Sequence, residues 1–187
     1  MTSNRLQLNT DKTDFILLGT RQQLGDTSLK EIDIHCVRFP VSTTVTCLGV
    51  LIDSELKFAA HIRRLTSRCF YQLRQLRSIH RTLTTEAAKT LVHALVITGV
   101  DYCNSIFGLT SAVHLRSLQF VVNAAARLIV KRRKYDHITD SLRDDLHLLP
   151  IHYRSCYKLC IFIYKCLHCA APSYLVDQCV SSVFRSP

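Results

Sequence analysis

KFAAHIRRLTSRCFYQLRQLRSIHRTLTT, from Lys57 to Thr85, is the stretch of sequence that indicates the fold most directly. Its apolar residues recur three or four positions apart, so on a helix with about 3.6 residues per turn they form one continuous stripe. The members of the stripe are Phe58, Ile62, Leu65, Cys69, Leu73, Leu76, Ile79 and Leu83. The spacing therefore predicts a long amphipathic helix with one buried face.

The polar residues of the same stretch are strongly basic. Residues 57–85 contain seven Lys and Arg side chains and no Asp or Glu. On a helical projection the basic residues fall opposite the apolar stripe or flank it. Those opposite it are Arg63, Arg74, Arg77 and Arg81, and those flanking it are Lys57, Arg64 and Arg68. One face of this helix is suited to a core and the other to an anion.

The charge of the whole chain agrees with this interpretation. The chain has 24 Lys and Arg against 14 Asp and Glu, which gives a formal net charge of +10. Such an excess favours polyanionic partners, either nucleic acid or an acidic membrane surface. For the basic face, contact with a nucleic-acid backbone is the preferred interpretation, and a solvated surface or contact with lipid are the alternatives.

A second basic patch comprises Lys131, Arg132, Arg133 and Lys134. It comes after a predicted helix over residues 111–130, and cations are favourable at a helix C-terminus. We take it as the second candidate for nucleic-acid contact. A nuclear-import signal or a simple helix end are its competing interpretations.

The remaining pattern predicts an α+β fold that is mostly α. Strand-like runs at residues 13–19, 31–39 and 45–53 predict a small N-terminal antiparallel β element. Further helices are expected from Thr84 or Thr85 to about Gly99, over residues 111–130, and after Pro150. Residues 156–167 are apolar almost all round, which predicts the central, most buried helix. We place the domain boundary between residues 1–53 and 54–187.

No motif in the sequence provides a reaction centre. Asp144 and Asp145 are adjacent acidic residues in a polar segment and are expected to be a solvated surface pair. Cys156, Cys160, Cys166 and Cys169 are expected to be buried thiols, with a metal site and a redox role as the less favoured alternatives. No phosphate-binding or hydrolase motif occurs, so no cofactor and no small-molecule substrate are expected. Without a membrane-spanning or signal-type segment, an intracellular protein of nucleus or cytoplasm is expected, with no membrane partner.

Six ordered blocks resemble the C-terminal part of the reverse transcriptase of non-LTR retrotransposons of the LINE, Jockey type. The resemblance covers most of the chain. The blocks are NTDKTDFILLG from Asn9, VTCLGVLIDSELKFAAHI from Val45, LVHALVITGVDYCNS from Leu91, NAAARLI from Asn123, YDHIT from Tyr135, and LHLLP from Leu146 through YKCLHCAAPSYL from Tyr164.

This resemblance implies that residues 1–53 are the remnant of a polymerase palm end and that residues 54–187 form the thumb and the region C-terminal to it. In the family the thumb holds the template and primer, which implies RNA or an RNA–DNA duplex as a partner, bound by its backbone. The palm and fingers of the parent polymerase would be a second partner. The catalytic aspartates of the family lie upstream, so the chain is expected to be a non-catalytic fragment of an RNA-directed DNA polymerase.

The sequence departs from the family at particular residues. Leu148 stands where the family usually has Trp, and Cys169 stands where it usually has Gly, which removes an easy left-handed helix end. The alternative function is a relic or protein-interaction helical domain without a nucleic-acid role. A similarity of the helical middle to the N-terminal extension of an AlkB-type tRNA-modifying dioxygenase is less favoured, because the chain offers neither an iron triad nor a glycine-rich methyl-donor loop.

Overall fold

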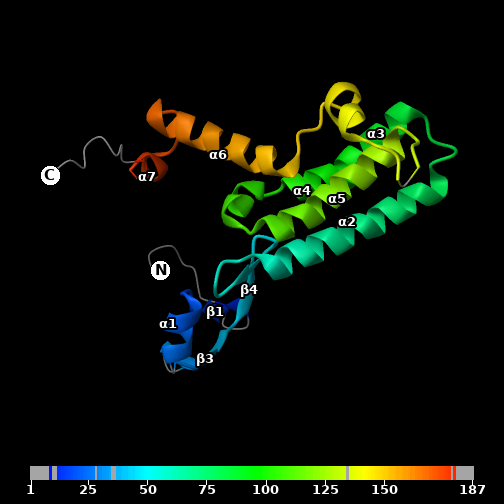
Figure 1. Ribbon diagram of the computed structural model, residues 1–187. Coiled ribbons are helices and arrows are strands. Elements are labelled where there is room, and N and C mark those ends of the chain that lie inside the picture. The colour runs from blue at the N-terminus through cyan, green and yellow to red at the C-terminus, as the bar shows by residue number, and fades with distance from the viewer. Residues whose placement is uncertain are drawn as a thin grey trace. The chain divides into compact units, whose positions relative to one another are not determined.

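The computed structural model describes residues 9, 12–27, 29–34, 37–133, 135–177 and 179. Small sheets come first and helices come after them, so the prediction of an α+β, mostly α fold is confirmed (Figure 1). The chain divides into two compact units, Met1–His61 and Ile62–Pro187. The sequence placed the boundary after Asp53, whereas in the structure the turn after Asp53 and the first residues of the long helix belong to the first unit.

The first unit contains two small sheets and one short helix. Its elements are β1 (Phe15–Ile16), α1 (Arg21–Asp26), β2 (Glu31–Ile34), β3 (Val37–Ser42), β4 (Thr44–Cys47) and β5 (Val50–Asp53). One sheet has the order β1-β3-β2 and the other is the β4-β5 pair. The expected antiparallel pairing holds for β2 with β3 and for β4 with β5. In contrast, β1 pairs with β3 in parallel, through Phe15 with Val41 and Ile16 with Ser42.

Side-chain hydrogen bonds fix the turn that leads from β5 into the long helix. The Asp53 carboxylate accepts hydrogen bonds from the backbone N–H groups of Lys57 (2.9 Å) and Phe58 (2.6 Å). His61 is buried, and its Nδ1 accepts a bond from the Leu51 N–H at 3.2 Å. Because Nδ1 acts as an acceptor, the ring proton lies on Nε2. These bonds explain why the first residues of the helix belong to the first unit.

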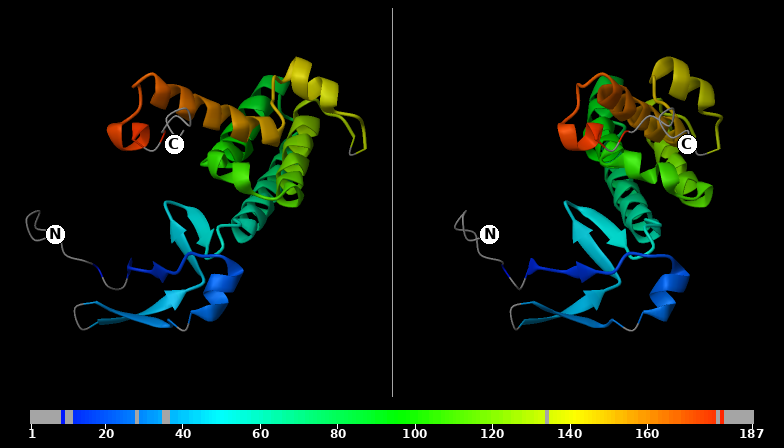
Figure 2. Two further views of the ribbon diagram at one scale, coloured as in Figure 1. Left: turned by 60° about the vertical axis from the view of Figure 1, so that its left-hand side comes forward. Right: turned by 90° about the vertical axis from the view of Figure 1, so that its left-hand side faces the viewer.

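The second unit is helical (Figure 2). Its elements are the greater part of α2 (Ala59–Ile79), α3 (Thr85–Val92), the π-helix η3 (His93–Ile97), α4 (Thr98–Asp101), the 3-10 helix η4 (Asn104–Leu109), α5 (Ala112–Ile129), the π-helix η5 (Ser141–Asp145), α6 (Ile151–Leu167) and α7 (Ser173–Val176). Thr84 caps α3, as predicted, by accepting a bond from the Ala87 N–H at 3.2 Å. The helix expected to run to Gly99 is interrupted by the π turn of η3.

The core of this unit is formed by the apolar faces of α2, α3 to α4, and α5. The predicted stripe of α2 is buried at five positions, Ile62, Leu65, Cys69, Leu73 and Leu76, while Ile79 at the end of the helix is exposed. From the other helices the fully buried side chains include Val92, Val96, Val100, Leu118, Val121 and Val122. Gly99 faces α2, because a Cβ at this position would lie 3.8 Å from Leu65 Cδ1, at ordinary van der Waals distance. The amphipathic pattern of α2 thus predicted its buried face correctly.

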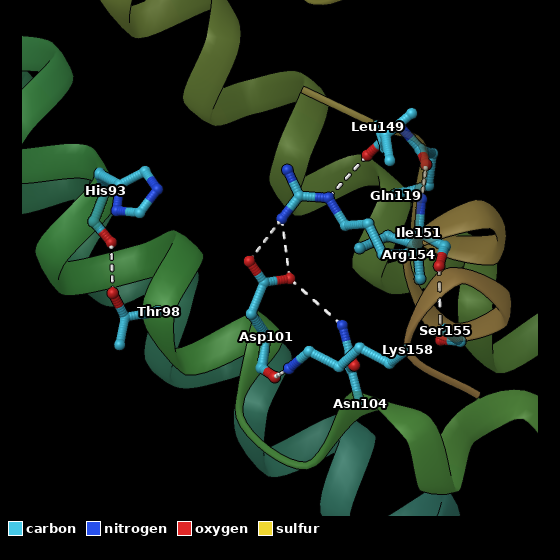
Figure 3. A network of polar contacts seen from close by, with 10 residues as sticks. All are labelled: His93, Thr98, Asp101, Asn104, Gln119, Leu149, Ile151, Arg154, Ser155 and Lys158. Carbon is cyan, nitrogen blue, oxygen red and sulfur yellow. Dashed lines mark hydrogen bonds and ion pairs between the residues drawn. The ribbon is translucent and has the colours of Figure 1, made fainter. Parts of the chain in front are cut away.

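A polar network attaches the N-terminal half of α6 to the end of α4 (Figure 3). Arg154 Nη1 lies 2.8 Å from both carboxylate oxygens of Asp101, and its Nε donates to the Leu149 carbonyl at 2.7 Å. Lys158 Nζ donates to the backbone carbonyl of Asp101 at 2.6 Å, and Asn104 Nδ2 donates to the Asp101 carboxylate at 3.3 Å. Arg154 is 9% exposed, so its charge is compensated largely inside the protein.

The expectation that α6 is the most buried helix is wrong. Between residues 156 and 167 only Cys166 is buried, and most of the apolar side chains are exposed. The core is already filled by α2 to α5, and α6 contacts the rest of the unit mainly through η4 and α5. Apolar residues on every side of a helix allow each side to be buried. In the described part of this chain, few of the apolar side chains of α6 have other residues packed against them.

Candidate nucleic-acid interface

The predicted basic residues of α2 lie on its exposed face. Arg63, Arg64, Arg68, Arg74 and Arg77 are exposed, and so is Arg81 just beyond the helix. Among the described residues, no Asp or Glu lies within ion-pair distance of Arg63, Arg68, Arg74, Arg77 or Arg81. Their positive charge is therefore not compensated by neighbouring described carboxylates, and it is available to an external anion.

The length of this face suits an extended polyanion. Arg77 lies fourteen positions after Arg63, and at about 1.5 Å per residue this is roughly 21 Å along the helix axis. One strand of a duplex carries a phosphate about every 3.4 Å, so roughly six phosphates fit along this distance. An isolated phosphate group would use only a fraction of the surface.

Two aromatic side chains lie on the exposed surface of α2 and were not singled out from the sequence. Tyr71 is 53% exposed and Phe70 is 36% exposed. Exposed aromatic rings between arginines are a common arrangement in proteins that contact sugars and bases as well as phosphates. The sequence does contain a signal for them. Neither residue belongs to the apolar stripe, which indicates that both rings lie outside the core.

The structure brings the two predicted basic patches together. Arg77 of α2 lines a cavity of about 280 Å³ with Arg127, Lys131, Arg132 and Arg133 from the end of α5. His80 and Leu128 complete the lining. We call this cavity the cationic groove. Arg127 and His80 were missed in the sequence, although Arg127 lies one helical turn before Lys131 and could have been linked to the second patch by that spacing.

Backbone hydrogen bonds hold the shape of the cationic groove. The Arg132 N–H bonds to the Arg127 carbonyl at 3.0 Å, and between them Lys131 has a left-handed backbone with φ of 54°. This geometry is a common way for a helix to end, although glycine is the usual residue at the left-handed position. Lys131 Nζ donates to the carbonyl of Leu83 at 3.3 Å, which connects the end of α5 with the segment after α2.

The loop after α5 also fixes the basic residues. Arg132 Nη1 donates to the carbonyl of His137 at 2.9 Å, and Arg127 Nε donates to the carbonyl of Asp136 at 3.2 Å. The Asp136 carboxylate accepts a bond from the backbone N–H of Arg133 at 2.8 Å. The guanidinium groups of Arg127 and Arg132 are thus held in place by carbonyl oxygens, which order them without neutralising their charge.

Six of the predicted contact residues that the structure describes do not line the groove. Lys57 lies in the first unit, and its ammonium group pairs with the Glu55 carboxylate, so its charge is partly offset. Lys134 lies outside the described residues. Arg63, Arg64, Arg68, Arg74 and Arg81 do not line the cavity, and the first four of them extend the basic surface along α2.

The other candidate residues show ordinary environments. Asp144 and Asp145 are exposed as predicted, and a hydrogen bond from Arg143 lowers the pKa of the Asp144 carboxyl. Of the four cysteines, Cys166 is buried, Cys156 is half-buried, and Cys160 and Cys169 are exposed, so the expectation of four buried thiols holds for only one. Burial raises the pKa of Cys166, and contact with Cys179 raises it further. Within the described part of the chain, no three or more His, Cys, Asp and Glu side chains are grouped to hold a metal ion.

No helix of the described residues is both long enough and apolar enough to span a bilayer. Comparison of the chain with known protein families, with curated proteins and with solved structures finds no match.

Proposed function

We propose that this chain binds RNA or an RNA–DNA duplex through its phosphate backbone, using the basic face of α2 and the cationic groove. In this proposal it acts as the duplex-holding, thumb-like part of a reverse transcriptase of the non-LTR retrotransposon type, and it binds without catalysing a reaction. The observation that carries the proposal is the position of Arg77, which belongs to the basic face of α2 and also lines the groove with Arg127 and Arg133.

Physical chemistry supports backbone contact over a sequence-specific site. Arginines bind phosphate oxygens through planar, forked donors, and each phosphate contact releases condensed counterions. Phosphate contacts position a protein on a duplex but carry no sequence information. We therefore expect the affinity to depend strongly on salt and weakly on base sequence.

The test compares two variants with equal loss of charge. Arg63, Arg74 and Arg77 are changed together to Gln, which removes three exposed cations that have no carboxylate partner among the described residues. The control changes Arg21, Lys30 and Arg116 to Gln, three exposed cations on other parts of the chain. Fluorescence anisotropy with a labelled RNA–DNA duplex is then measured over a range of salt concentrations.

We expect the α2 variant to lose roughly tenfold or more in affinity and to show a salt slope smaller by about two to three units, because fewer counterions are released. The control variant should stay close to the unaltered chain. Equal losses in both variants would mean that only net charge attracts the duplex, and no loss in the α2 variant would contradict the proposal.

A separate measurement addresses catalysis. The purified chain is supplied with a primed RNA template, nucleoside triphosphates and magnesium, and primer extension is monitored on a gel. The proposal expects no extension by the chain alone. Incorporation of nucleotides would show an active centre and would replace the proposal of a binding role with that of an enzyme.

A further inference from the structure

The exposed side of α6 carries tyrosines at regular spacing. Tyr153, Tyr157 and Tyr164 are 61%, 60% and 63% exposed. Together with Cys160 and Leu167, which are also exposed, they succeed one another four, three, four and three positions apart. On a helix this spacing places all five side chains on one face, with the three phenol rings along its length. We call these three residues the tyrosine row.

One exposed cation flanks the tyrosine row. No Asp or Glu occurs from Leu146 to Val176, and of the three Lys and Arg in this segment Arg154 and Lys158 are engaged with Asp101, which leaves Lys165 and three histidines. Lys165 is exposed and lies one residue from Tyr164. Tyr164 also contacts His168, with the ring centroids 4.1 Å apart. A ligand that combines flat rings with negative charge fits this surface.

The residue types favour unpaired nucleotides over a second helix. A coiled-coil seam at this spacing would bury the row, and each buried phenol would then need a hydrogen-bond partner. Base stacking instead covers the faces of the rings and leaves the hydroxyl groups in water. Stacking on aromatic side chains within a basic surface is the usual way in which proteins hold single-stranded nucleic acid.

A cavity at the start of the row offers space for a base. It has a volume of about 730 Å³, within the range of small-ligand sites, and Tyr153 forms part of its wall. Gln119 is held in this wall, because its Oε1 accepts from the Ile151 N–H at 2.9 Å and its Nε2 donates to Asn123 Oδ1 at 2.8 Å. Asn123 Nδ2 has no hydrogen bond to the described residues and can donate to the edge of a base.

We infer that the tyrosine row of α6 binds single-stranded nucleic acid by stacking its unpaired bases on Tyr153, Tyr157 and Tyr164. This inference deepens the proposed function and rests on it, because it adds a site for an unpaired strand to a surface that binds a duplex. The two sites use different residues on different helices, so each can fail without the other.

The test uses the full chain and two labelled probes, oligo(U) and a blunt RNA–DNA duplex. One variant changes Tyr153, Tyr157 and Tyr164 to Leu, which keeps apolar surface but removes the rings. The matched control changes the same residues to Phe, which keeps the rings. A third variant carries Gln at the three positions and remains informative if the Leu variant associates through its added apolar surface. The helical content of each variant is checked by circular dichroism.

The Leu and Gln variants should bind oligo(U) roughly tenfold or more weakly, because base stacking is lost. The Phe variant should stay within about threefold of the unaltered chain, and binding of the duplex should be unchanged in all of them. Since the chain contains no Trp, quenching of tyrosine emission by oligo(U) gives an independent signal. The unaltered chain should show this quenching. The part of the quenching that arises from the tyrosine row should be absent from the Phe variant.

Several results would overturn the inference. Binding of oligo(U) by the Leu variant with unchanged affinity would show that the rings are not used. A row that instead holds a second copy of the chain would appear as a change of sedimentation in the Gln variant with oligo(U) binding unaltered. Equal losses for oligo(U) and the duplex would assign the effect to the duplex surface. Duplex binding that is lost only in the Arg63, Arg74 and Arg77 variant would support the proposed function, whatever the tyrosine variants show.

Discussion

Cys169 ends α6 in a backbone conformation that its side chain disfavours. Its φ is 51°, in the left-handed region that glycine adopts without strain. Around it the Ala170 N–H bonds to the Lys165 carbonyl at 2.8 Å and the Cys169 N–H bonds to the Cys166 carbonyl at 3.3 Å. These are the two bonds of the Schellman motif. Cys at a position where glycine is usual thus raises the cost of the helix end and preserves its geometry.

Replacing Cys169 with Gly should stabilise the protein. Gly relieves the left-handed strain of about 1 kcal/mol or more, and part of this gain is offset by the greater freedom of glycine in the unfolded chain. We expect a net gain of about 0.5–1 kcal/mol in the free energy of unfolding, measured by urea denaturation. A lower urea midpoint for the Gly variant would contradict this account.

The same change at Lys131 should separate stability from binding. Lys131 has the equivalent position at the end of α5, with φ of 54°, but it also lines the cationic groove. We expect Lys131→Gly to raise the free energy of unfolding by roughly 0.5 kcal/mol and to weaken duplex binding, because a strained residue is replaced and a cation is lost. Cys169→Gly serves as the control that relieves strain away from the groove. Unchanged duplex affinity in Lys131→Gly would exclude Lys131 from the contact.

Cys69 should make stability fall in alkaline solution. Burial in the α2 stripe raises the pKa of its thiol from 9.0 to about 11, and the neighbouring Arg68 lowers it slightly. Between these values the unfolded chain loses this proton before the folded protein does. Stability from this thiol is therefore complete below about pH 9 and declines as the pH rises towards 11, by roughly 2 kcal/mol in total.

The measurement compares the chain with its Cys69→Ala variant. The free energy of unfolding is determined for both from about pH 8 to about pH 11, and their difference isolates Cys69 from the tyrosines and lysines that also titrate there. The difference should shrink as the pH rises. A constant difference would show that the Cys69 thiol ionises in the folded protein as readily as in the unfolded chain.

Among the elements, α2 and α6 show what a helical pattern does and does not predict. In α2 the apolar residues occupy one stripe, so the sequence identified both its buried face and its basic face. In α6 apolar residues occur on all sides, and the sequence could not state which of them find a partner. Burial depends on which other elements fill the core, and that information lies in contacts between residues such as Gly108 and Leu159, far apart in the chain.

The position of α6 should depend on Arg154. Changing Arg154 to Met leaves the Asp101 carboxylate without its main partner, and we expect a loss of about 2–3 kcal/mol in the free energy of unfolding. The expected loss is below that for a deeply buried pair because the Asp101 side chain is 34% exposed. Arg154→Lys should recover part of the loss, since it keeps the charge but not the forked geometry.

A double-mutant cycle checks that the loss arises from this ion pair. Asp101→Asn and Arg154→Met are made singly and together, and the free energies of unfolding are compared. The double variant should lose clearly less than the sum of the single variants. Additive losses would mean that the two residues act independently.

At the scale of the whole molecule, the sequence predicted the two basic patches of the candidate site but not that they lie close together. Both basic patches were visible as runs of charge, and the class of the fold could be predicted from hydrophobic periodicity. The proximity of Arg77 to the end of α5 depends on how α2 and α5 pack, which no local pattern records. The parallel pairing of β1 with β3 was missed for the same reason, because pairing direction is a property of two distant segments.

The aromatic residues on the exposed surface of α6 include tyrosines, and the whole chain has no tryptophan. This composition has a practical consequence for any preparation of this protein. With seven Tyr and no Trp, the chain absorbs near-ultraviolet light weakly. Bound host nucleic acid absorbs strongly at shorter wavelengths, so even a small carried-over amount would dominate the spectrum. The absorbance ratio of the first purified fraction, before and after nuclease and a high-salt wash, therefore indicates whether cellular RNA or DNA accompanies the chain.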